Sequence, residues 1–281
     1  MAVQQPFLCS IHNLLRKEFA PFNTNIVLKS LPYSAKQINI VLYVHIRYNN
    51  CTITKIYNGK GVLKVKNVYV VLSATPTAIG KAIRTVTRST FNHASISLTK
   101  DLSEMYSFAR YRARNPLVGG FIQEFPQRLT LGKNKDVHIK VFEIPLTNYQ
   151  YEKIRQFVYG IKDDEDQCLY NLLAILGRPF GLGNNTYKAY VCTDFVVKAL
   201  VQGEVSLVQS ILAPITPGEM EQLLDKYLVY DGMLVDYNPA PACRTELVDE
   251  FFRKASPLSE ACQTALHFCR LISRAIKGRE C

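Results

Sequence analysis

Two residues of this chain have types and surroundings suited to nucleophilic catalysis, namely His93 and Cys192. His93 begins a segment in which apolar and small polar residues alternate, 93–98, and this alternation predicts a strand with one apolar face. Cys192 begins an apolar-periodic segment that predicts a helix. A helix N-terminus favours the thiolate form of a cysteine, because the helix dipole stabilises the negative charge. A cysteine nucleophile and a histidine base supplied by distant segments, as in many active sites, are one interpretation, and a satisfied core histidine is the alternative for His93.

Cys192 differs in its surroundings from the other seven cysteines of the chain. A free cysteine is commonly a buried core residue, and that is the alternative for Cys192 as well. Thr193 and Asp194 fill the first turn of the predicted helix, which is typical of an exposed helix N-terminus. The others lie on predicted apolar helix faces, in predicted turns or near the chain ends: Cys262, Cys269, Cys51, Cys168, Cys243, Cys9 and Cys281. Neither C-x-x-C spacing nor ligand spacing among the histidines occurs, so no metal or cofactor is predicted.

Composition and charge limit the class of protein. The chain has 281 residues, of which 48% are hydrophobic and 20% charged, enough for a full core in one large domain or two smaller ones. The net charge of +11 favours an anionic partner for the basic surface, but a basic surface with no specific partner is the alternative, because the charge is spread out and no nucleic-acid-binding motif is present. Without a secretory signal pattern or an apolar run of ~20 residues, we expect a cytoplasmic protein with no transmembrane segment. The sequence leaves the oligomeric state open.

Three regions follow one another along the chain. Region 1–66 is rich in β-branched residues and turn dipeptides, which predicts a small β-rich segment with a helix at 11–19 and strands at 38–47, 51–56 and 61–65. Region 67–237 alternates predicted strands and helices and carries both candidate residues. Region 238–281 follows a Pro-rich break and predicts two amphipathic C-terminal helices, at 245–254 and 257–277.

The middle region supplies the elements that must position the two residues. A helix is expected over 75–88, with Thr75 as its cap and Pro76 in its first turn. A hairpin follows His93 and continues through a Gly-Gly turn into a third strand that ends at Glu124. Further strands are expected at 68–74, 140–146 and 227–235, and further helices at 147–160, 170–176, 192–202 and 217–226.

Five segments of the middle region together resemble a known family: FNHASISL, MYSFARYRARNPLVGGFIQE, YNLLAILG, YVCTDFVVKAL and ITPGEMEQLLDKYLVYDGMLVDY. They are similar to the circularly permuted branch of the NlpC/P60 superfamily of papain-like cysteine hydrolases, and to lecithin:retinol acyltransferase-like proteins. In that branch the strand with the histidine precedes the helix with the cysteine, as His93 precedes Cys192 here. The resemblance covers about residues 68–237. It implies an α+β fold, a papain-like core whose antiparallel sheet packs on the helix that begins at Cys192.

The same resemblance assigns roles in catalysis. Cys192 is the expected nucleophile and His93 the base, and the backbone N–H of Cys192 helps to stabilise the oxyanion. The family commonly places a polar, orienting residue on the strand after the histidine, where Ser107 is the nearest match. Serine orients an imidazole weakly, so Glu124 and Glu104 are alternatives. For Glu124, the competing interpretation is a surface strand residue.

Aromatic and basic residues near the pair suggest a substrate site. Tyr106 and Tyr190 flank the candidate pair and are expected to line a substrate groove, or else to be core or rim aromatics. Arg110, Arg112 and Arg114 alternate after the hairpin, either as a basic edge for an anionic substrate or as a solvated strand edge: the sequence does not decide.

The leading hypothesis is a thiol protease-like cysteine hydrolase that cleaves an amide or ester bond in a peptide, amide or lipid-like substrate. The alternatives are an acyltransferase of the same fold and a non-catalytic binding or scaffold protein with a basic surface.

Overall fold

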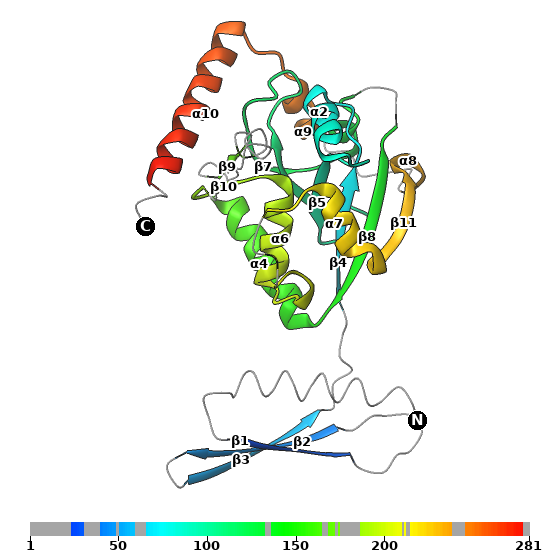
Figure 1. The fold of residues 1–281 in the computed structure, drawn as a ribbon, viewed down its shortest axis with the longest axis vertical. Helices are drawn as coiled ribbons and strands as arrows, with labels where there is room; N and C mark the ends of the chain where they lie inside the picture. Colours follow the sequence, from blue (N-terminus) through cyan, green and yellow to red (C-terminus); the bar gives the residue numbers. More distant parts are fainter. Residues whose placement is uncertain are drawn as a thin grey trace. The chain divides into compact units, whose positions relative to one another are not determined.

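The structure is a computed structural model of the chain. It describes residues 24–30, 40–48, 51–59, 66–132, 136–164, 168–171, 174, 186–209, 211, 214–237 and 245–277. The expected helix at 11–19 and the expected strand at 61–65 lie outside these residues. The chain divides into two compact units, Met1–Lys64 and Val65–Cys281 (Figure 1).

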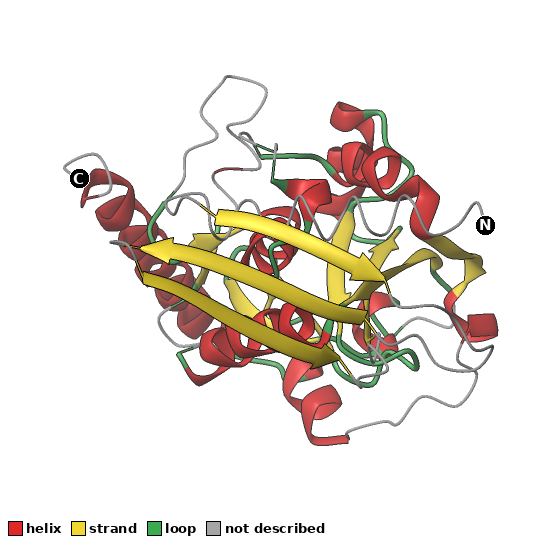
Figure 2. Ribbon diagram, turned by 90° about the horizontal axis from the view of Figure 1, so that it is seen from below, coloured by secondary structure: helices red, strands yellow, loops and turns green. Residues whose placement is uncertain are grey.

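The N-terminal unit contains a three-stranded antiparallel sheet in the order β1-β2-β3, whose strands run side by side (Figure 2). Its strands are β1 (Thr24–Ser30), β2 (Ile40–Tyr48) and β3 (Cys51–Gly59). Strands β2 and β3 form a hairpin in which Tyr48 pairs with Cys51. The sequence predicted β2 and β3 but not β1.

The larger unit is built on an eight-stranded mixed sheet in the order β10-β9-β7-β6-β5-β4-β8-β11. Neighbouring strands of this sheet pair antiparallel, except that β9 and β10 run parallel at one edge. The sheet is therefore mixed, whereas the sequence predicted an antiparallel sheet. Its strands are β4 (Lys66–Ser73), β5 (His93–Ser97), β6 (Met105–Arg110), β7 (Gly119–Gln123), β8 (His138–Leu146), β9 (Leu169–Tyr170), β10 (Ala189–Tyr190) and β11 (Leu228–Met233). The unit is therefore a mixed α/β structure with an open sheet.

Helices α4 (Asn148–Asp163) and α6 (Cys192–Gln202) lie side by side, and α6 packs on β5 and β6 (Figure 1). An aromatic cluster joins sheet and helix, because Phe108 and Phe121 both contact the ring of Phe195 on α6. The remaining helices are α2 (Ala78–Thr87), α3 (Pro126–Leu129), α7 (Pro217–Leu224), α8 (Leu234–Tyr237), α9 (Thr245–Phe252) and α10 (Pro257–Lys277). Among the described residues, no helix combines the length and the apolar character needed to cross a membrane.

Helix α2 begins later than the sequence suggested. Its N-cap is Thr77, whose hydroxyl accepts a hydrogen bond of 2.8 Å from the backbone N–H of Gly80. The expected cap, Thr75, instead donates its backbone N–H to Asn92 Oδ1 and accepts from Asn92 Nδ2, at 2.8 and 3.0 Å. Both threonines are competent caps, and the buried bonds to Asn92 decide between them. These bonds fix the backbone immediately before His93.

Replacement of Thr77 by alanine is expected to destabilise the larger unit by about 1 kcal/mol, because the N–H of Gly80 loses its acceptor. Urea denaturation followed by circular dichroism measures this loss. The matched control is Thr85→Ala in the exposed part of the same helix, which should change stability by less than ~0.5 kcal/mol. Equal losses in the two variants would contradict the capping role.

A second correction concerns residues 170–176, expected as a helix. Tyr170 belongs to strand β9 and pairs with Tyr190 of β10. Of the following residues, Asn171 and Ala174 lie in the described part of the chain, and Ala174 is helical, so the correction applies to the start of the predicted helix.

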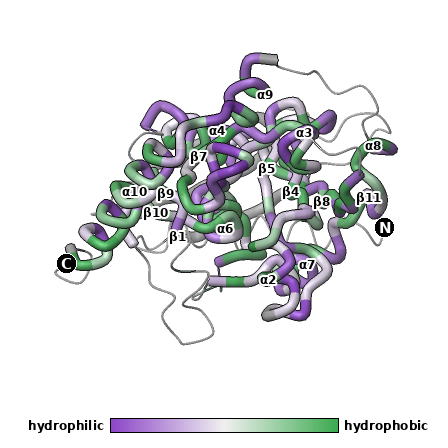
Figure 3. The backbone as a smooth tube through the Cα atoms, turned by 90° about the horizontal axis from the view of Figure 1, so that it is seen from above, coloured by the Kyte–Doolittle hydropathy of each residue, from purple (hydrophilic) through white to green (hydrophobic). Residues whose placement is uncertain are grey.

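The two C-terminal helices begin where the sequence predicted them, at Thr245 and Pro257. Helix α10 carries hydrophobic and hydrophilic residues along its whole length, as an amphipathic helix does (Figure 3). The backbone N–H of Ala113 donates to the carbonyl of Phe251 on α9, at 2.9 Å. Asn115 donates to the hydroxyl of Thr264 on α10, at 3.2 Å. Both helices therefore pack against the loop that joins β6 and β7.

Candidate active site

His93 is the first residue of β5, where it pairs with Ser73 of the central strand β4. The side chain of His93 is 11% exposed. The Asn92–Thr75 bonds on one side and the strand pairing on the other hold the backbone of His93 between two rigid elements. A histidine fixed in this way presents its ring nitrogens in a defined direction.

One ring nitrogen of His93 lies against a buried carboxylate. Glu124 follows β7, and its Oε1 lies 2.7 Å from His93 Nε2. Ser107, on β6, donates to the same Oε1 at 2.6 Å, and its hydroxyl lies 3.2 Å from His93 Nε2. The Glu124 side chain is only 1% exposed, so the interpretation of Glu124 as a surface residue is wrong. The structure thus brings Ser107 and Glu124 together at one nitrogen of His93.

The third alternative, Glu104, lies elsewhere. Its Oε2 accepts a hydrogen bond of 3.2 Å from the hydroxyl of Tyr159 on α4. Among the described contacts, Glu104 has none with His93, so the structure places Glu124 and Ser107, not Glu104, in the orienting position.

Arg128 is a member of the cluster that the sequence did not suggest. It lies on α3, and its Nε is 3.2 Å from Glu124 Oε2. Its guanidinium stacks over the ring of Phe251, at 4.3 Å from the ring centre. The only signals in the sequence were the spacing of four residues from Glu124 and the intervening Pro126, which starts a helical turn. A buried carboxylate with an arginine on one oxygen and a histidine and a serine on the other is held in one orientation.

The charges of this cluster reinforce one another. Burial alone would lower the pKa of His93, but hydrogen bonds to Cys192 and Glu124 and the negative charges of both raise it from 6.5 to about 10. Burial would raise the pKa of Glu124, but His93, Arg128 and Ser107 lower it from 4.5. Burial lowers the pKa of Arg128 to about 10, against the opposing charge of Glu124. At neutral pH, Glu124 is therefore ionised while His93 and Arg128 are cationic.

Cys192 is the first residue of α6, after the N-cap Val191. Its thiol lies near the His93 ring and raises the pKa of that imidazole. Because Nε2 faces Glu124 and Ser107, Nδ1 is the nitrogen left for the thiol. The expected exposure of this helix N-terminus is wrong: Cys192 is 6% and Thr193 2% exposed. The reason is that α6 packs on β5, so its first turn lies against the sheet near His93.

Tyr170 is a second residue that sequence reasoning did not place in the site. Burial is the main effect that raises the pKa of Tyr170. The negative charge of Cys192 raises this pKa further, while the positive charge of Arg110 lowers it. Tyr170 therefore stays a neutral phenol near the thiol. A neutral hydroxyl can donate a hydrogen bond to a developing negative charge.

The two tyrosines expected in a substrate groove have different positions. Tyr106 is 2% exposed, stacks on Phe121 at 5.5 Å and lines a cavity of about 670 Å³. Tyr190 is half-buried, contacts the ring of Phe108 at 4.9 Å and lies under the ammonium of Lys198. Both rings therefore pack in the aromatic cluster, and substrate binding by them stays a prediction.

The donors required for a metal do not gather here. Within the described ranges, no group of three or more His, Cys, Asp or Glu residues could hold a metal ion. The arrangement is suited to acid–base and nucleophilic chemistry, because the imidazole of His93 lies between a thiol and an ionised carboxylate in space. Comparison with protein families, with curated proteins and with solved structures found no match for this chain.

Proposed function

We propose that this chain is a cysteine hydrolase of the permuted papain-like type, which cleaves an amide, thioester or ester bond. The observation that carries the proposal is the position of His93, whose ring has the Cys192 thiol as one partner and the buried Glu124 carboxylate as another. A thiol, an imidazole and an orienting carboxylate in this order form the relay that cysteine hydrolases need. The order of histidine strand and cysteine helix along the chain agrees with it.

In the proposed reaction, the thiol proton of Cys192 already resides on His93 as a thiolate–imidazolium pair, and the thiolate sulfur attacks the substrate carbonyl carbon. The resulting oxyanion is stabilised by the backbone N–H of Cys192 at the start of α6. His93 then gives its proton to the leaving amine, alcohol or thiol, and an acyl-thioester on Cys192 remains. His93 next deprotonates a water, which attacks the thioester and releases the acid and the thiol.

Glu124 has a positioning role in this scheme. Its carboxylate accepts from Nε2 of His93 and so directs Nδ1 towards Cys192. Its negative charge also stabilises the His93 imidazolium that pairs with the thiolate and later protonates the leaving group. Arg128 and Ser107 hold Glu124 in turn.

The acceptor of the acyl group distinguishes the hydrolase from the acyltransferase alternative. Both classes form the same acyl-thioester, which an alcohol or an amine resolves in an acyltransferase. Incubation of the acylated protein with and without an added amine, followed by mass spectrometry of the product, separates the two.

Alkylation by iodoacetamide tests the Cys192–His93 pair. We expect Cys192 to react at least ~10-fold faster than Cys262 and Cys269 near neutral pH, because a thiolate and not a thiol is the nucleophile. Both reference cysteines are exposed and are read in the same mass spectrum. His93→Ala should remove the difference, whereas His138→Ala, at an exposed histidine paired with Asp231, should leave it unchanged.

Because Cys192 is buried, reagent access needs a separate readout. The ultraviolet absorbance of the thiolate reports ionisation without any reagent. If Cys192 is unreactive and the native protein has no thiolate absorbance near neutral pH, the catalytic proposal is wrong and a non-catalytic binding protein is the better interpretation.

A further inference from the structure

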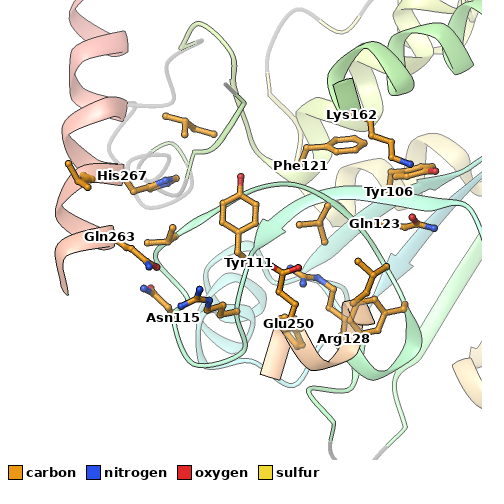
Figure 4. A pocket seen from close by; sticks show the side chains of 18 of the residues that line it. Tyr106, Tyr111, Asn115, Phe121, Gln123, Arg128, Lys162, Glu250, Gln263 and His267 are labelled. Atoms are coloured by element: carbon orange, nitrogen blue, oxygen red, sulfur yellow. The ribbon is translucent and has the colours of Figure 1, made fainter. Parts of the chain in front are cut away.

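A cavity of about 670 Å³ lies between the β6–β7 hairpin with its loop and the C-terminal helices α9 and α10. Figure 4 shows Gln263 and His267 entering it from α10, while Tyr106, Phe121 and Lys162 lie on the other side. This volume falls within the range of small-molecule sites in proteins. Cys192 and His93 are not among its lining residues, so it is distinct from the proposed catalytic pair.

The charges that line this cavity are unequal. Four lining residues are cationic, namely Arg112, Arg128, Lys162 and Arg270, and one, Glu250, is acidic. The lining histidine, His267, has a pKa lowered by burial, so it adds no positive charge at neutral pH. An excess of cations around a concave site attracts anionic ligands.

Arg128 gives the cavity a specific donor. This residue is 8% exposed, and its Nη2 has no hydrogen-bond partner within the described part of the chain. Its Nε is engaged by Glu124 and its planar face by Phe251. A buried guanidinium nitrogen without an acceptor is costly, so the Arg128 side chain has hydrogen-bonding capacity left for an oxyanion bound beside it.

Aromatic side chains form much of the remaining wall. Tyr106, Tyr111, Phe121, Phe125 and Phe251 all line the cavity. Flat apolar surfaces of this kind bury an aromatic or aliphatic body, while the polar groups fix its orientation.

We propose that this cavity binds a small molecule with an aromatic or apolar body and an oxyanion, either a carboxylate or a phosphate, and that the Arg128 guanidinium binds the oxyanion. The site stands independently of the hydrolase proposal, since Cys192 and His93 do not take part in it. The same guanidinium holds Glu124 through Nε, so the bound anion and the candidate active site share one arginine.

Calorimetric titration of the full-length Cys192→Ala protein tests the site without catalysis. The probes are phenyl phosphate and phenylacetate, and the controls with the same ring are benzyl alcohol and benzylamine. We expect at least one anion to bind with a Kd below ~1 mM and at least ~10-fold more tightly than either control. The tighter of the two anions identifies the oxyanion. Equal binding of benzyl alcohol, or no binding of either anion, would overturn the proposal.

Variants assign the contact. Arg128→Lys keeps a positive charge but loses the second donor of the guanidinium, and should weaken anion binding by ~10-fold or more. Arg112→Gln removes a cation from the wall and should weaken it ~3- to 10-fold, which provides a second variant if Arg128→Lys does not fold. The matched control is Lys153→Gln, the same loss of charge on α4 away from the cavity, with an expected change below ~2-fold. Equal weakening by Lys153→Gln and Arg112→Gln would contradict a local site.

Discussion

Replacement of Glu124 by alanine is expected to lower the free energy of unfolding of the larger unit by ~3–5 kcal/mol. The carboxylate is 1% exposed and is the charge partner of both Arg128 and His93. Without it, Arg128 loses its carboxylate partner, His93 keeps only Cys192 as a negative partner, and Ser107 loses the acceptor that lies 2.6 Å from its hydroxyl. Urea denaturation monitored by near-ultraviolet circular dichroism measures the loss.

The control for this prediction is a carboxylate in a surface ion pair. Glu152 pairs with Lys66 at 2.8 Å, but both side chains are about 40% exposed, so Glu152→Ala should cost much less stability than Glu124→Ala. Combining Glu124→Gln with Arg128→Met should recover part of the stability, because no unpaired arginine then remains buried. A loss in Glu124→Ala no larger than that in Glu152→Ala would show that Glu124 is not a buried charge in solution.

Glu124→Ala should also affect the proposed chemistry. Without the carboxylate at Nε2, the imidazole of His93 loses the group that fixes its orientation and stabilises its positive charge. The rate of Cys192 alkylation near neutral pH should fall along with the stability. Glu124→Gln, which keeps the shape but not the charge, separates the two effects in a protein that remains folded.

The sequence was informative where local patterns determine structure. The alternation that begins at His93 and the helical periodicity that begins at Cys192 each predicted an element whose first residue is the candidate residue. The sequence does not decide the orienting residue of His93, because the choice among Ser107, Glu104 and Glu124 depends on strand register. In the structure, Ser107 pairs with Ile122 in the β6–β7 ladder, two residues before Glu124. Chain connectivity alone does not give that pairing, whereas the sheet places both side chains at His93.

The features that the sequence missed depend on tertiary contacts. In the sequence, nothing distinguishes Arg128 from an arginine on the surface. In the structure, the ring of Phe251, from a helix far along the chain, covers its guanidinium. The apolar neighbours of Tyr170 predict a helix, but in the structure Tyr170 belongs to a strand, because β9 pairs in parallel with β10. Thr75 and Thr77 are equivalent caps by local rules, and Asn92 decides between them. In each case a partner distant in sequence determines the outcome.

The His93 ring is expected to keep its proton far above the pH at which an ordinary histidine loses it. Nuclear magnetic resonance of the labelled imidazole should give a titration midpoint well above 6.5, near 10, because the partners Cys192 and Glu124 outweigh the effect of burial. His267 is an internal reference, since burial lowers its pKa and its midpoint should lie below 6.5. Glu124→Gln should move the His93 midpoint down. A midpoint at or below 6.5 would mean that desolvation dominates and that the partners do not hold the proton.

The same shift makes stability depend on pH with a defined sign. Because the pKa of His93 is higher in the folded than in the unfolded state, its protonation stabilises the fold. This contribution is complete below the unfolded pKa of 6.5 and is lost as the pH rises towards the folded value of about 10. The loss from His93 amounts to at most ~5 kcal/mol, at 1.36 kcal/mol per pKa unit. The lowered pKa of Glu124 acts in the opposite direction, stabilising above 4.5 and losing its effect as the pH falls below that value. Both groups therefore contribute fully only between about pH 4.5 and 6.5, and His93→Gln should flatten the decline in stability above this window.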